Sequence, residues 1–269
     1  MKMHPGSKLA IASRASIVGR KEPGGVNQDA ARFRVSETGN IIAAVGDGVG
    51  SLPDSHLFSA VATQAVLESL AEVEEILRGH EEASEVDLVT VENHFHATIR
   101  ERVRNALLGL DGRDGATTLL YAVLHGKRLY WSMVGDGAIA ILPRDGGKAF
   151  MEQMEGREFG YTDVVEPRNM TSPGWCTGWD LIDAVSMIVL MTDGVSDAME
   201  DDPTVFLRFL DDQLAGLSSA AGSARLKNLL QHFPEAHGDD KSLVTIRIAS
   251  RDIITDEPPS GAGPRGGEL

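Results

Sequence analysis

Six short apolar runs punctuate a sequence that is otherwise rich in polar and charged residues. They span Ile41–Val45, Thr117–Leu124, Arg128–Val134, Ala138–Leu142, Val185–Met191 and Leu243–Ile248. Continuous apolar runs of this length are typical of strands that are buried within a sheet. Only His125, Gly126 and Lys127 join the second run to the third, so we expect these two strands to form a hairpin. The runs therefore predict a sheet that is largely antiparallel.

Longer stretches between these runs have the spacing of amphipathic helices. The first helix is predicted to begin near Asp54, and the second has an apolar residue at every fourth position from Val91 to Leu107. These two helices are adjacent in sequence, and we expect them to be antiparallel. Two further helices are predicted at Pro203–Leu214 and Ala220–Phe233. This alternation of strands and helix pairs predicts an α+β fold rather than a parallel βαβ winding.

The composition is that of a globular protein with an acidic surface. The chain has 25 Lys and Arg against 40 Asp and Glu, which gives a net charge of −15, so no general binding to nucleic acid is expected. Its one cysteine, Cys176, excludes an intrachain disulfide framework and a multi-cysteine zinc site. We find neither a signal peptide nor an apolar run long enough to cross a membrane, so a cytoplasmic location without membrane attachment is expected.

The domain organisation is predicted from where the composition changes. We expect one domain at 1–250, because no linker with the character of a domain boundary precedes its end. Residues 251–269 are rich in proline and glycine and are predicted to be a disordered tail. Residues 142–180 are predicted to be an irregular insertion. The tryptophans Trp175 and Trp179 in it either pin the insertion to the core or contact a partner peptide.

Aspartates stand at the ends of several of the apolar runs. Asp47 and Asp193 each follow a run directly and precede a glycine, and Asp239 lies just before the last run. Three carboxylates that converge on one edge of a sheet repel one another, and a hard cation such as Mg²⁺ or Mn²⁺ relieves that repulsion. A single Asp-Gly pair is more typical of a turn, and we interpret Asp136-Gly137 as a hairpin turn. The constellation predicts a metal site that no single pair predicts.

Six segments carry these aspartates and their neighbours in a particular order. The segments are GGVNQDA (24–30), AAVGDGVGS (43–51), GATTLL (115–120), VGDGAIAIL (134–142), VLMTDGVSD (189–197) and GDDKSLVTI (238–246). Together they resemble the metal-dependent protein phosphatases, also called the type 2C family, and a bacterial branch of it most closely. The resemblance implies a four-layer sandwich of two mainly antiparallel β-sheets flanked by antiparallel helix pairs. Residues 142–180 would then take the place of the variable flap beside the active site.

The resemblance also implies a binuclear Mg²⁺ or Mn²⁺ centre at one edge of the sandwich. Asp47 would bridge both ions, and the Gly48 carbonyl would bind one of them. Asp193 and Asp239 would bind the other, and Asp29 would hold metal-bound waters behind these ligands. With Asp47, Asp193 and Asp239 as its catalytic carboxylates, the implied enzyme is a serine/threonine phosphoprotein phosphatase. It would hydrolyse a phosphoserine or phosphothreonine through a water that bridges the two ions.

Two parts of the family pattern are altered in this sequence. A third ion would draw on Asp193 and on Asp111 or Asp114, although the spacing before Gly115 is not the usual one. At the end of the chain, Asp240 stands where the family has an asparagine.

The phosphate-binding arginine of the family is also missing. That arginine lies five residues before the aspartate of the NQD element and grips the substrate phosphate, and Gly24 occupies its position here. Arg20 and Lys21 are the candidate replacements, and the alternative is that both are solvated surface charges. Three functions therefore remain open: a phosphatase, a pseudophosphatase that keeps the fold as a binding module, and an acidic metal-binding regulator. The phosphoprotein substrate and the oligomeric state are not predicted.

Overall fold

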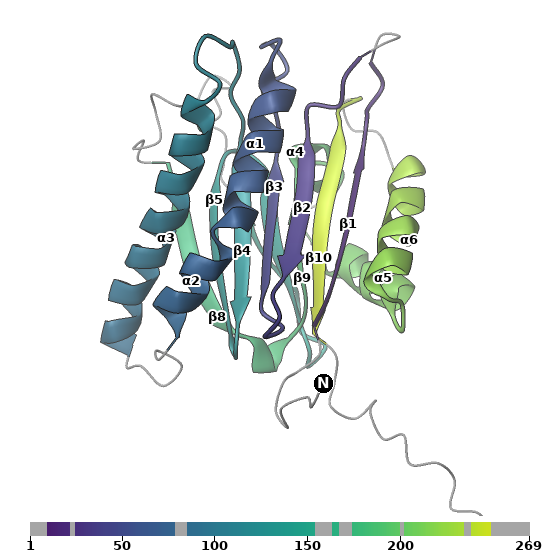
Figure 1. Ribbon diagram of the computed structural model, residues 1–269. Helices are drawn as coiled ribbons and strands as arrows, with labels where there is room; N and C mark the ends of the chain where they lie inside the picture. Colours follow the sequence, from purple (N-terminus) through teal and green to yellow (C-terminus); the bar gives the residue numbers. More distant parts are fainter. Residues whose placement is uncertain are drawn as a thin grey trace, which may run out of the picture.

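The computed structural model of the chain describes two sheets that face each other, with helices on both outer faces (Figure 1). The described residues are 10–21, 25–78, 85–153, 163–166, 174–199, 202–233 and 238–248, with the backbone alone at 85–88 and 153. The predicted tail at 251–269 and the middle of the predicted insertion lie outside these ranges. Within the described ranges, no helix combines the length and the apolar character that a membrane crossing requires.

Each sheet has five strands, and all neighbouring strands are antiparallel. The first sheet has the strand order β1–β10–β9–β6–β7, and the second has the order β2–β3–β4–β5–β8. The strands of the first sheet are β1 (Ala10–Ile17), β10 (Lys241–Ile248), β9 (Val185–Met191), β6 (Ala138–Pro143) and β7 (Phe150–Gln153). Those of the second sheet are β2 (Ala30–Val35), β3 (Ile41–Gly46), β4 (Leu119–His125), β5 (Arg128–Val134) and β8 (Cys176–Leu181).

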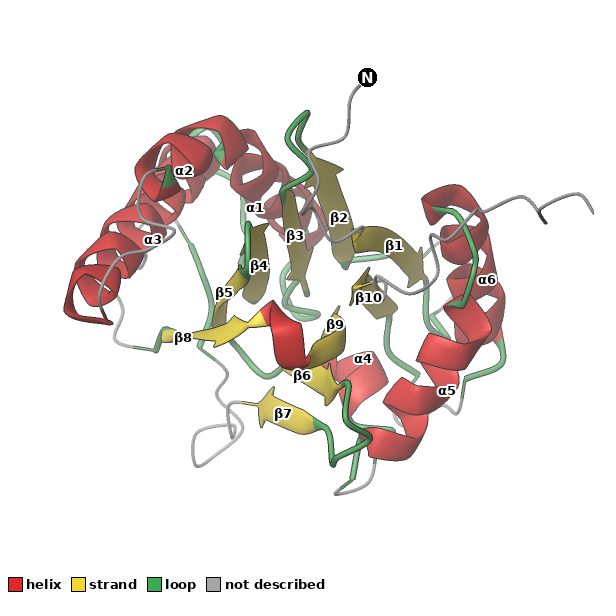
Figure 2. Ribbon diagram, turned by 90° about the horizontal axis from the view of Figure 1, so that it is seen from below, coloured by secondary structure: helices red, strands yellow, loops and turns green. Residues whose placement is uncertain are grey.

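The helices form the two outer layers, as Figure 2 shows from below. The second sheet is covered by α1 (Ser55–Glu68), α2 (Leu70–Leu77) and α3 (Glu85–Leu108), and the first sheet by α5 (Thr204–Leu214) and α6 (Ser219–Gln231). A 3-10 turn (Ile182–Ala184) precedes β9, and a single helical turn, α4 (Asp193–Ser196), follows β9. The predicted four-layer α+β sandwich is confirmed.

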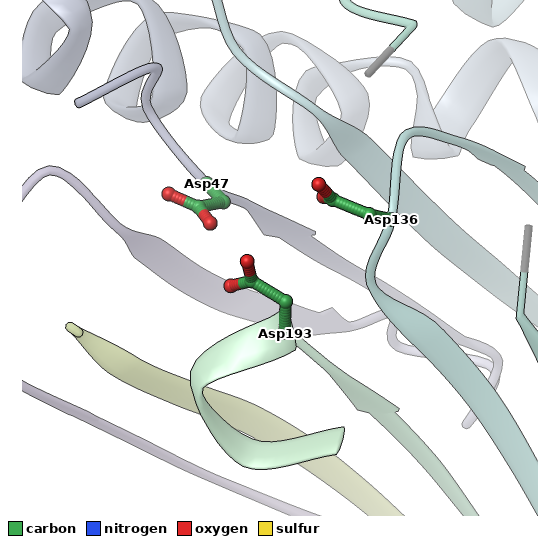
Figure 3. Close-up of side chains that lie close together, drawn as sticks. All are labelled: Asp47, Asp136 and Asp193. Atoms are coloured by element: carbon green, nitrogen blue, oxygen red, sulfur yellow. The ribbon is translucent and has the colours of Figure 1, made fainter. Parts of the chain in front are cut away.

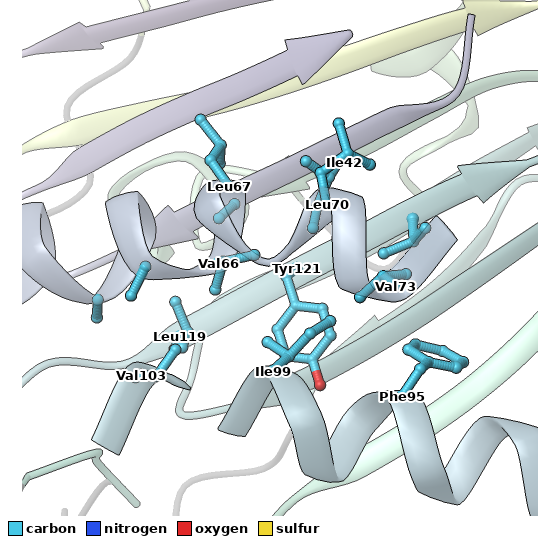
Figure 4. Close-up of a cluster of buried hydrophobic side chains, with 14 of the residues drawn as sticks. Ile42, Val66, Leu67, Leu70, Val73, Phe95, Ile99, Val103, Leu119 and Tyr121 are labelled. Atoms are coloured by element: carbon cyan, nitrogen blue, oxygen red, sulfur yellow. The ribbon is translucent and has the colours of Figure 1, made fainter. Parts of the chain in front are cut away.

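Three apolar layers hold the sandwich together, one between the sheets and one beneath each set of helices. Alternate residues of a central strand face different layers: in β4, Leu120 and Ala122 face the other sheet, whereas Leu119 and Tyr121 face the helices. Figure 4 shows the layer under α1, α2 and α3, where Phe95 and other side chains of α3 meet the second sheet. Because both faces of these strands are buried, their sequences are mostly apolar.

The six predicted strands are the six interior strands of the two sheets, β3, β4, β5, β6, β9 and β10. The hairpin of β4 and β5 is confirmed, with His125 opposite Arg128. The structure adds the four edge strands, of which β7 lies inside the predicted irregular insertion and β8 overlaps its end. The hairpin turn at Asp136-Gly137 is wrong, because β5 belongs to the second sheet and β6 to the first. This link carries the chain from one sheet to the other.

Trp175 anchors the described end of the insertion. Its ring lies under the guanidinium of Arg100, with 4.5 Å between Cζ and the ring centroid, and 6.2 Å from the ring of Tyr121. Arg100 and Tyr121 belong to α3 and β4. A cation over an aromatic face is attractive, so Trp175 acts as a pin that holds the start of β8 to the helical side of the second sheet.

The core between the sheets makes a direct prediction about stability. Ile188 on β9 is fully buried there, so Ile188→Ala should lower the free energy of unfolding by about 2–5 kcal/mol through lost burial and a residual cavity. Val205 on α5 is 77% exposed, and Val205→Ala should change it by less than about 0.5 kcal/mol. Urea denaturation measures both values. Equal effects of the two substitutions would contradict the assignment of this layer.

Candidate metal centre

Three carboxylates from three different connections meet at one edge of the sandwich. Asp47 follows β3, Asp136 lies between β5 and β6, and Asp193 opens α4 directly after β9. One carboxylate oxygen from each lies within 4.8 Å of the others, and all three residues are half-buried. Figure 3 shows the three side chains pointing toward a common space. The second sheet supplies the first carboxylate, the crossing between the sheets the second, and the first sheet the third.

Glycines beside these aspartates allow the connections to approach so closely. A Cβ at Gly194 would lie 2.0 Å from the carbonyl oxygen of Asp240, and one at Gly137 would lie 2.6 Å from that of Met191. Neither distance is possible for a side-chain atom, so both positions require glycine. The Asp-Gly pairs that the sequence shows therefore serve close backbone contact around the carboxylates.

Backbone hydrogen bonds hold Asp47 from both sides. Its N–H donates to Oγ1 of Thr118 (3.0 Å), and its carbonyl accepts from the N–H of Thr118 and from Oγ1 of Thr117, both at 2.8 Å. The next residue, Gly48, donates its N–H to the carbonyl of Gln28 at 3.1 Å. The strand end that carries Asp47 is thus fixed to the residues just before β4 and to the segment before β2.

Asp29 lies buried behind the group. Its Oδ2 accepts a hydrogen bond from Oγ1 of Thr192 at 3.0 Å, and Thr192 is the residue before Asp193. The other oxygen, Oδ1, is buried and has no hydrogen-bond partner within the described part of the chain. An unpartnered buried carboxylate oxygen is costly, so Asp29 offers an acceptor for a further group such as a water molecule on a bound cation.

Repulsion and burial together disfavour the ionised forms of these acids. Burial raises the pKa of the Asp47 carboxyl well above its usual value, and the charges of Asp29 and Asp193 raise it further. Burial also raises the pKa of Asp193, with a further contribution from Asp136 and Asp239. Burial and the charge of Asp240 raise the pKa of Asp29 to about 7. A divalent cation would reverse this balance, because it favours the ionised carboxylates.

The donor set fits a hard divalent cation. All of the donors in the three-residue group are carboxylate oxygens, which Mg²⁺ and Mn²⁺ prefer over nitrogen or sulfur. Asp239 is exposed and lies close enough to Asp193 to raise its pKa, although it does not belong to the group itself. Gly48 is buried next to Asp47. The residues present therefore fit a centre of Mg²⁺ or Mn²⁺.

The structure brings some of the site residues predicted from the sequence together and leaves others apart. Asp47 and Asp193 come together, and Asp136, interpreted from the sequence as a turn, is the third member of the group. Asp111 and Asp114 lie in the exposed turn after α3, where the N–H of Asp114 donates to Asp54. The signal for Asp136 was present in the sequence, since the apolar runs on both sides of Asp136-Gly137 resemble those before Asp47 and Asp193.

The two candidate phosphate-binding residues have different surroundings. Nζ of Lys21 lies 2.5 Å from Oδ2 of Asp240 and 3.3 Å from Oε1 of Gln28, so its charge is engaged within the protein. Arg20 is exposed, and its Cβ lies 3.7 Å from the position that a Cβ on Gly238 would occupy, next to Asp239. Of the two candidates, Arg20 is therefore the one with an exposed side chain.

Comparison with known proteins identifies the fold and the family. The sequence model described as protein phosphatase 2C matches residues 19–231, which is well over half of the chain and includes Asp47, Asp136 and Asp193. This chain belongs to the protein phosphatase 2C family. The matched range ends before Asp239, which stands just ahead of β10. No curated protein sequence matches this family member significantly.

Solved structures of bacterial phosphatases share the fold of this protein phosphatase 2C chain. A bacterial serine phosphatase is 14% identical with a TM-score of 0.63, and the alignment covers 89% of this chain and 98% of that one. The serine/threonine phosphatase Stp1 from Staphylococcus aureus is 14% identical with a TM-score of 0.60, covering 93% and 99%. The S. agalactiae serine/threonine phosphatase is 14% identical with a TM-score of 0.62, covering 89% and 100%. At this identity the likeness establishes the fold.

The raised pKa values predict how the stability of the metal-free protein depends on pH. The pKa of Asp29 is about 7 in the folded protein, against an ordinary value of 3.8, so the folded state keeps a proton that the unfolded chain releases. The stability present below pH 4 should therefore decline as the pH rises through 7. Thermal unfolding in excess EDTA between pH 4 and pH 8 measures this decline. Saturating Mn²⁺ should raise the melting temperature most at the upper end of the range.

Two variants assign the pH effect to the site. Asp29→Asn should make the decline shallower, because it removes one of the groups whose pKa is raised. Asp212→Asn, on the exposed face of α5, should leave it unchanged. A decline that is as steep in Asp29→Asn as in the unaltered protein would contradict the electrostatic account of the site.

Proposed function

We propose that this protein is a Mg²⁺- or Mn²⁺-dependent phosphatase that hydrolyses phosphoserine or phosphothreonine in proteins. The observation that carries the proposal is the group of three strand-end carboxylates, Asp47, Asp136 and Asp193, whose oxygens lie within 4.8 Å of one another. Family membership supports it, because the match covers all three residues. The proposed reaction requires no cysteine nucleophile, because it is a direct hydrolysis.

The chain's residues have separate tasks in this proposal. Asp47, the Gly48 carbonyl, Asp193 and Asp239 would hold two cations, and the position of Asp136 suits a third cation better than the exposed turn that carries Asp111 and Asp114. Bound divalent cations supply the positive charge that attracts a phosphate and lowers the pKa of an attacking water. Asp29, with one oxygen held by Thr192, would orient a water with its other oxygen.

Substrate phosphate would be gripped at the exposed side of the group. Arg20 is proposed as the phosphate-binding residue, because its side chain is exposed beside the loop of Asp239. A guanidinium offers two parallel donors to a phosphate, which an ammonium does not. The chain has a net charge of −15, which repels an anionic substrate. Arg20 and the cations would supply the local positive charge that attracts it.

One observation favours a second candidate function. Gly24 occupies the position of the family's phosphate-binding arginine, and the nearby Lys21 is paired with Asp240. A chain that keeps the metal site but grips phosphate weakly would act as a pseudophosphatase, binding a partner with little turnover.

Hydrolysis assays separate the two candidates. We expect Mn²⁺-dependent hydrolysis of p-nitrophenyl phosphate and of a phosphothreonine peptide. Asp193→Asn should lower it by about 100-fold or more, because a ligand of the cations is lost. Asp212→Asn, the control on α5, should retain full activity. Mn²⁺ binding by the unaltered protein without hydrolysis of either substrate would overturn the phosphatase and favour the pseudophosphatase.

A further inference from the structure

Asp240 is a buried carboxylate with three hydrogen-bond donors around it. Its side chain is 2% exposed, and its Oδ1 accepts the N–H of Gly19 at 2.9 Å. Its Oδ2 accepts the N–H of Gln28 at 2.7 Å and lies 2.5 Å from Nζ of Lys21. A neutral amide at this position has one acceptor oxygen and would leave a donor without its partner. The carboxylate satisfies all three donors because it has two acceptor oxygens.

These donors come from the two ends of one segment, residues 19–28, which connects β1 to β2. At its first end, Gly19 lies against the backbone of Gly238 and Asp239, since a Cβ on Gly19 would be 2.2 Å from the Gly238 carbonyl oxygen. The other end reaches the opposite side of the site. There the Gln28 carbonyl accepts the N–H of Gly48 at 3.1 Å and a hydrogen bond from Oγ of Ser59 at 2.5 Å.

Asp240 therefore connects the two sides of the metal centre through a few bonds. On one side it is adjacent in sequence to Asp239, and on the other it reaches the Gly48 peptide through Gln28. The cost of this arrangement is a further negative charge near the group, because Asp240 raises the pKa of Asp29. Lys21 offsets that charge directly, since its side chain is only 24% exposed and its ammonium touches the carboxylate.

We propose that Lys21 and Asp240 form a positioning ion pair that holds residues 19–21 and Gln28 against the start of β10 and thereby aligns the Gly48 peptide with Asp239 across the metal centre. The proposal rests on the proposed function only in taking this edge of the sandwich as a cation site. Lys21 acts here through Asp240 and touches no substrate. In this proposal the charge of Lys21 has a structural role, in place of the phosphate-binding role considered from the sequence.

The direction in which one substitution changes the Mn²⁺ affinity distinguishes positioning from simple electrostatics. Lys21→Met removes a positive charge near a cation site, so charge alone predicts that Mn²⁺ binds as tightly or more tightly. Positioning predicts weaker binding, by about 10–100-fold, as for other residues that orient metal ligands. Isothermal titration of the full chain with Mn²⁺ alone, well below the melting temperature of each variant, measures the affinity without any substrate.

A double variant tests whether the two residues act as a unit. Asp240→Asn should also weaken Mn²⁺ binding, and Lys21→Met with Asp240→Asn should bind no more weakly than Lys21→Met alone, because the second substitution removes the unpaired buried charge. Fully additive losses would overturn the proposal. If Lys21→Met does not fold, Lys21→Gln is measured in its place with the same sign expected.

An ion pair near the far end of β10 provides the control. Nε of Arg247 on β10 lies 2.6 Å from Oδ1 of Asp211 on α5, with side chains that are 21% and 28% exposed, toward the other end of the strand. Arg247→Met should lower the melting temperature and leave the Mn²⁺ affinity unchanged. A loss of affinity equal to that of Lys21→Met would show that any ion-pair deletion weakens the site, and would overturn the proposal.

The outcomes also separate this proposal from the phosphatase itself. Mn²⁺ affinity that is unchanged or increased in Lys21→Met overturns the positioning pair and leaves the proposed function standing. Mn²⁺ binding that falls about tenfold or more in Lys21→Met, in a chain that hydrolyses nothing, supports the pair and overturns the phosphatase. Failure of the unaltered chain to bind Mn²⁺ overturns both.

Discussion

Carboxylates held together against their mutual repulsion are the constraint around which this molecule is organised. Asp47, Asp136 and Asp193 approach within 4.8 Å, and buried Asp29 lies behind them with a pKa raised to about 7. Such a group destabilises the folded state unless protons or cations offset the charge. The apolar layers above and below the two sheets supply the rigidity that keeps the strand ends in place. The apolar core therefore offsets the destabilisation that the clustered carboxylates cause at this edge.

The same edge shows two ways of offsetting charge in a chain of net charge −15. The three clustered carboxylates offer only oxygen ligands and suit divalent cations. Asp240, a few residues away, has the ammonium of Lys21 instead. Carboxylates that share a divalent ion and a carboxylate that has its own lysine are two different ways of offsetting negative charge. These two ways of offsetting charge explain why clustered aspartates and Lys21 lie at the same edge of the sandwich.

The limits of the sequence-based prediction follow from burial. The six interior strands are buried on both faces, so their apolar runs were recognisable, whereas β1, β2, β7 and β8 each lie at a sheet edge and include polar or charged residues such as Arg14 and Arg32. Asp47 and Asp193 were found because each ends a predicted strand. Asp136 was missed because the sequence does not show that β5 and β6 belong to different sheets. Lys21 pairs with Asp240 across 219 positions, a contact that no local pattern encodes.

The central claim is that these strand-end aspartates bind divalent cations together. Anomalous diffraction from crystals grown with Mn²⁺, collected on both sides of the manganese absorption edge, tests it most directly. The account predicts manganese peaks in contact with the carboxylates of Asp47 and Asp193, and the loss of those peaks in Asp193→Asn. Manganese located elsewhere, or no peak at this edge at Mn²⁺ concentrations that raise the melting temperature of the protein, would contradict it.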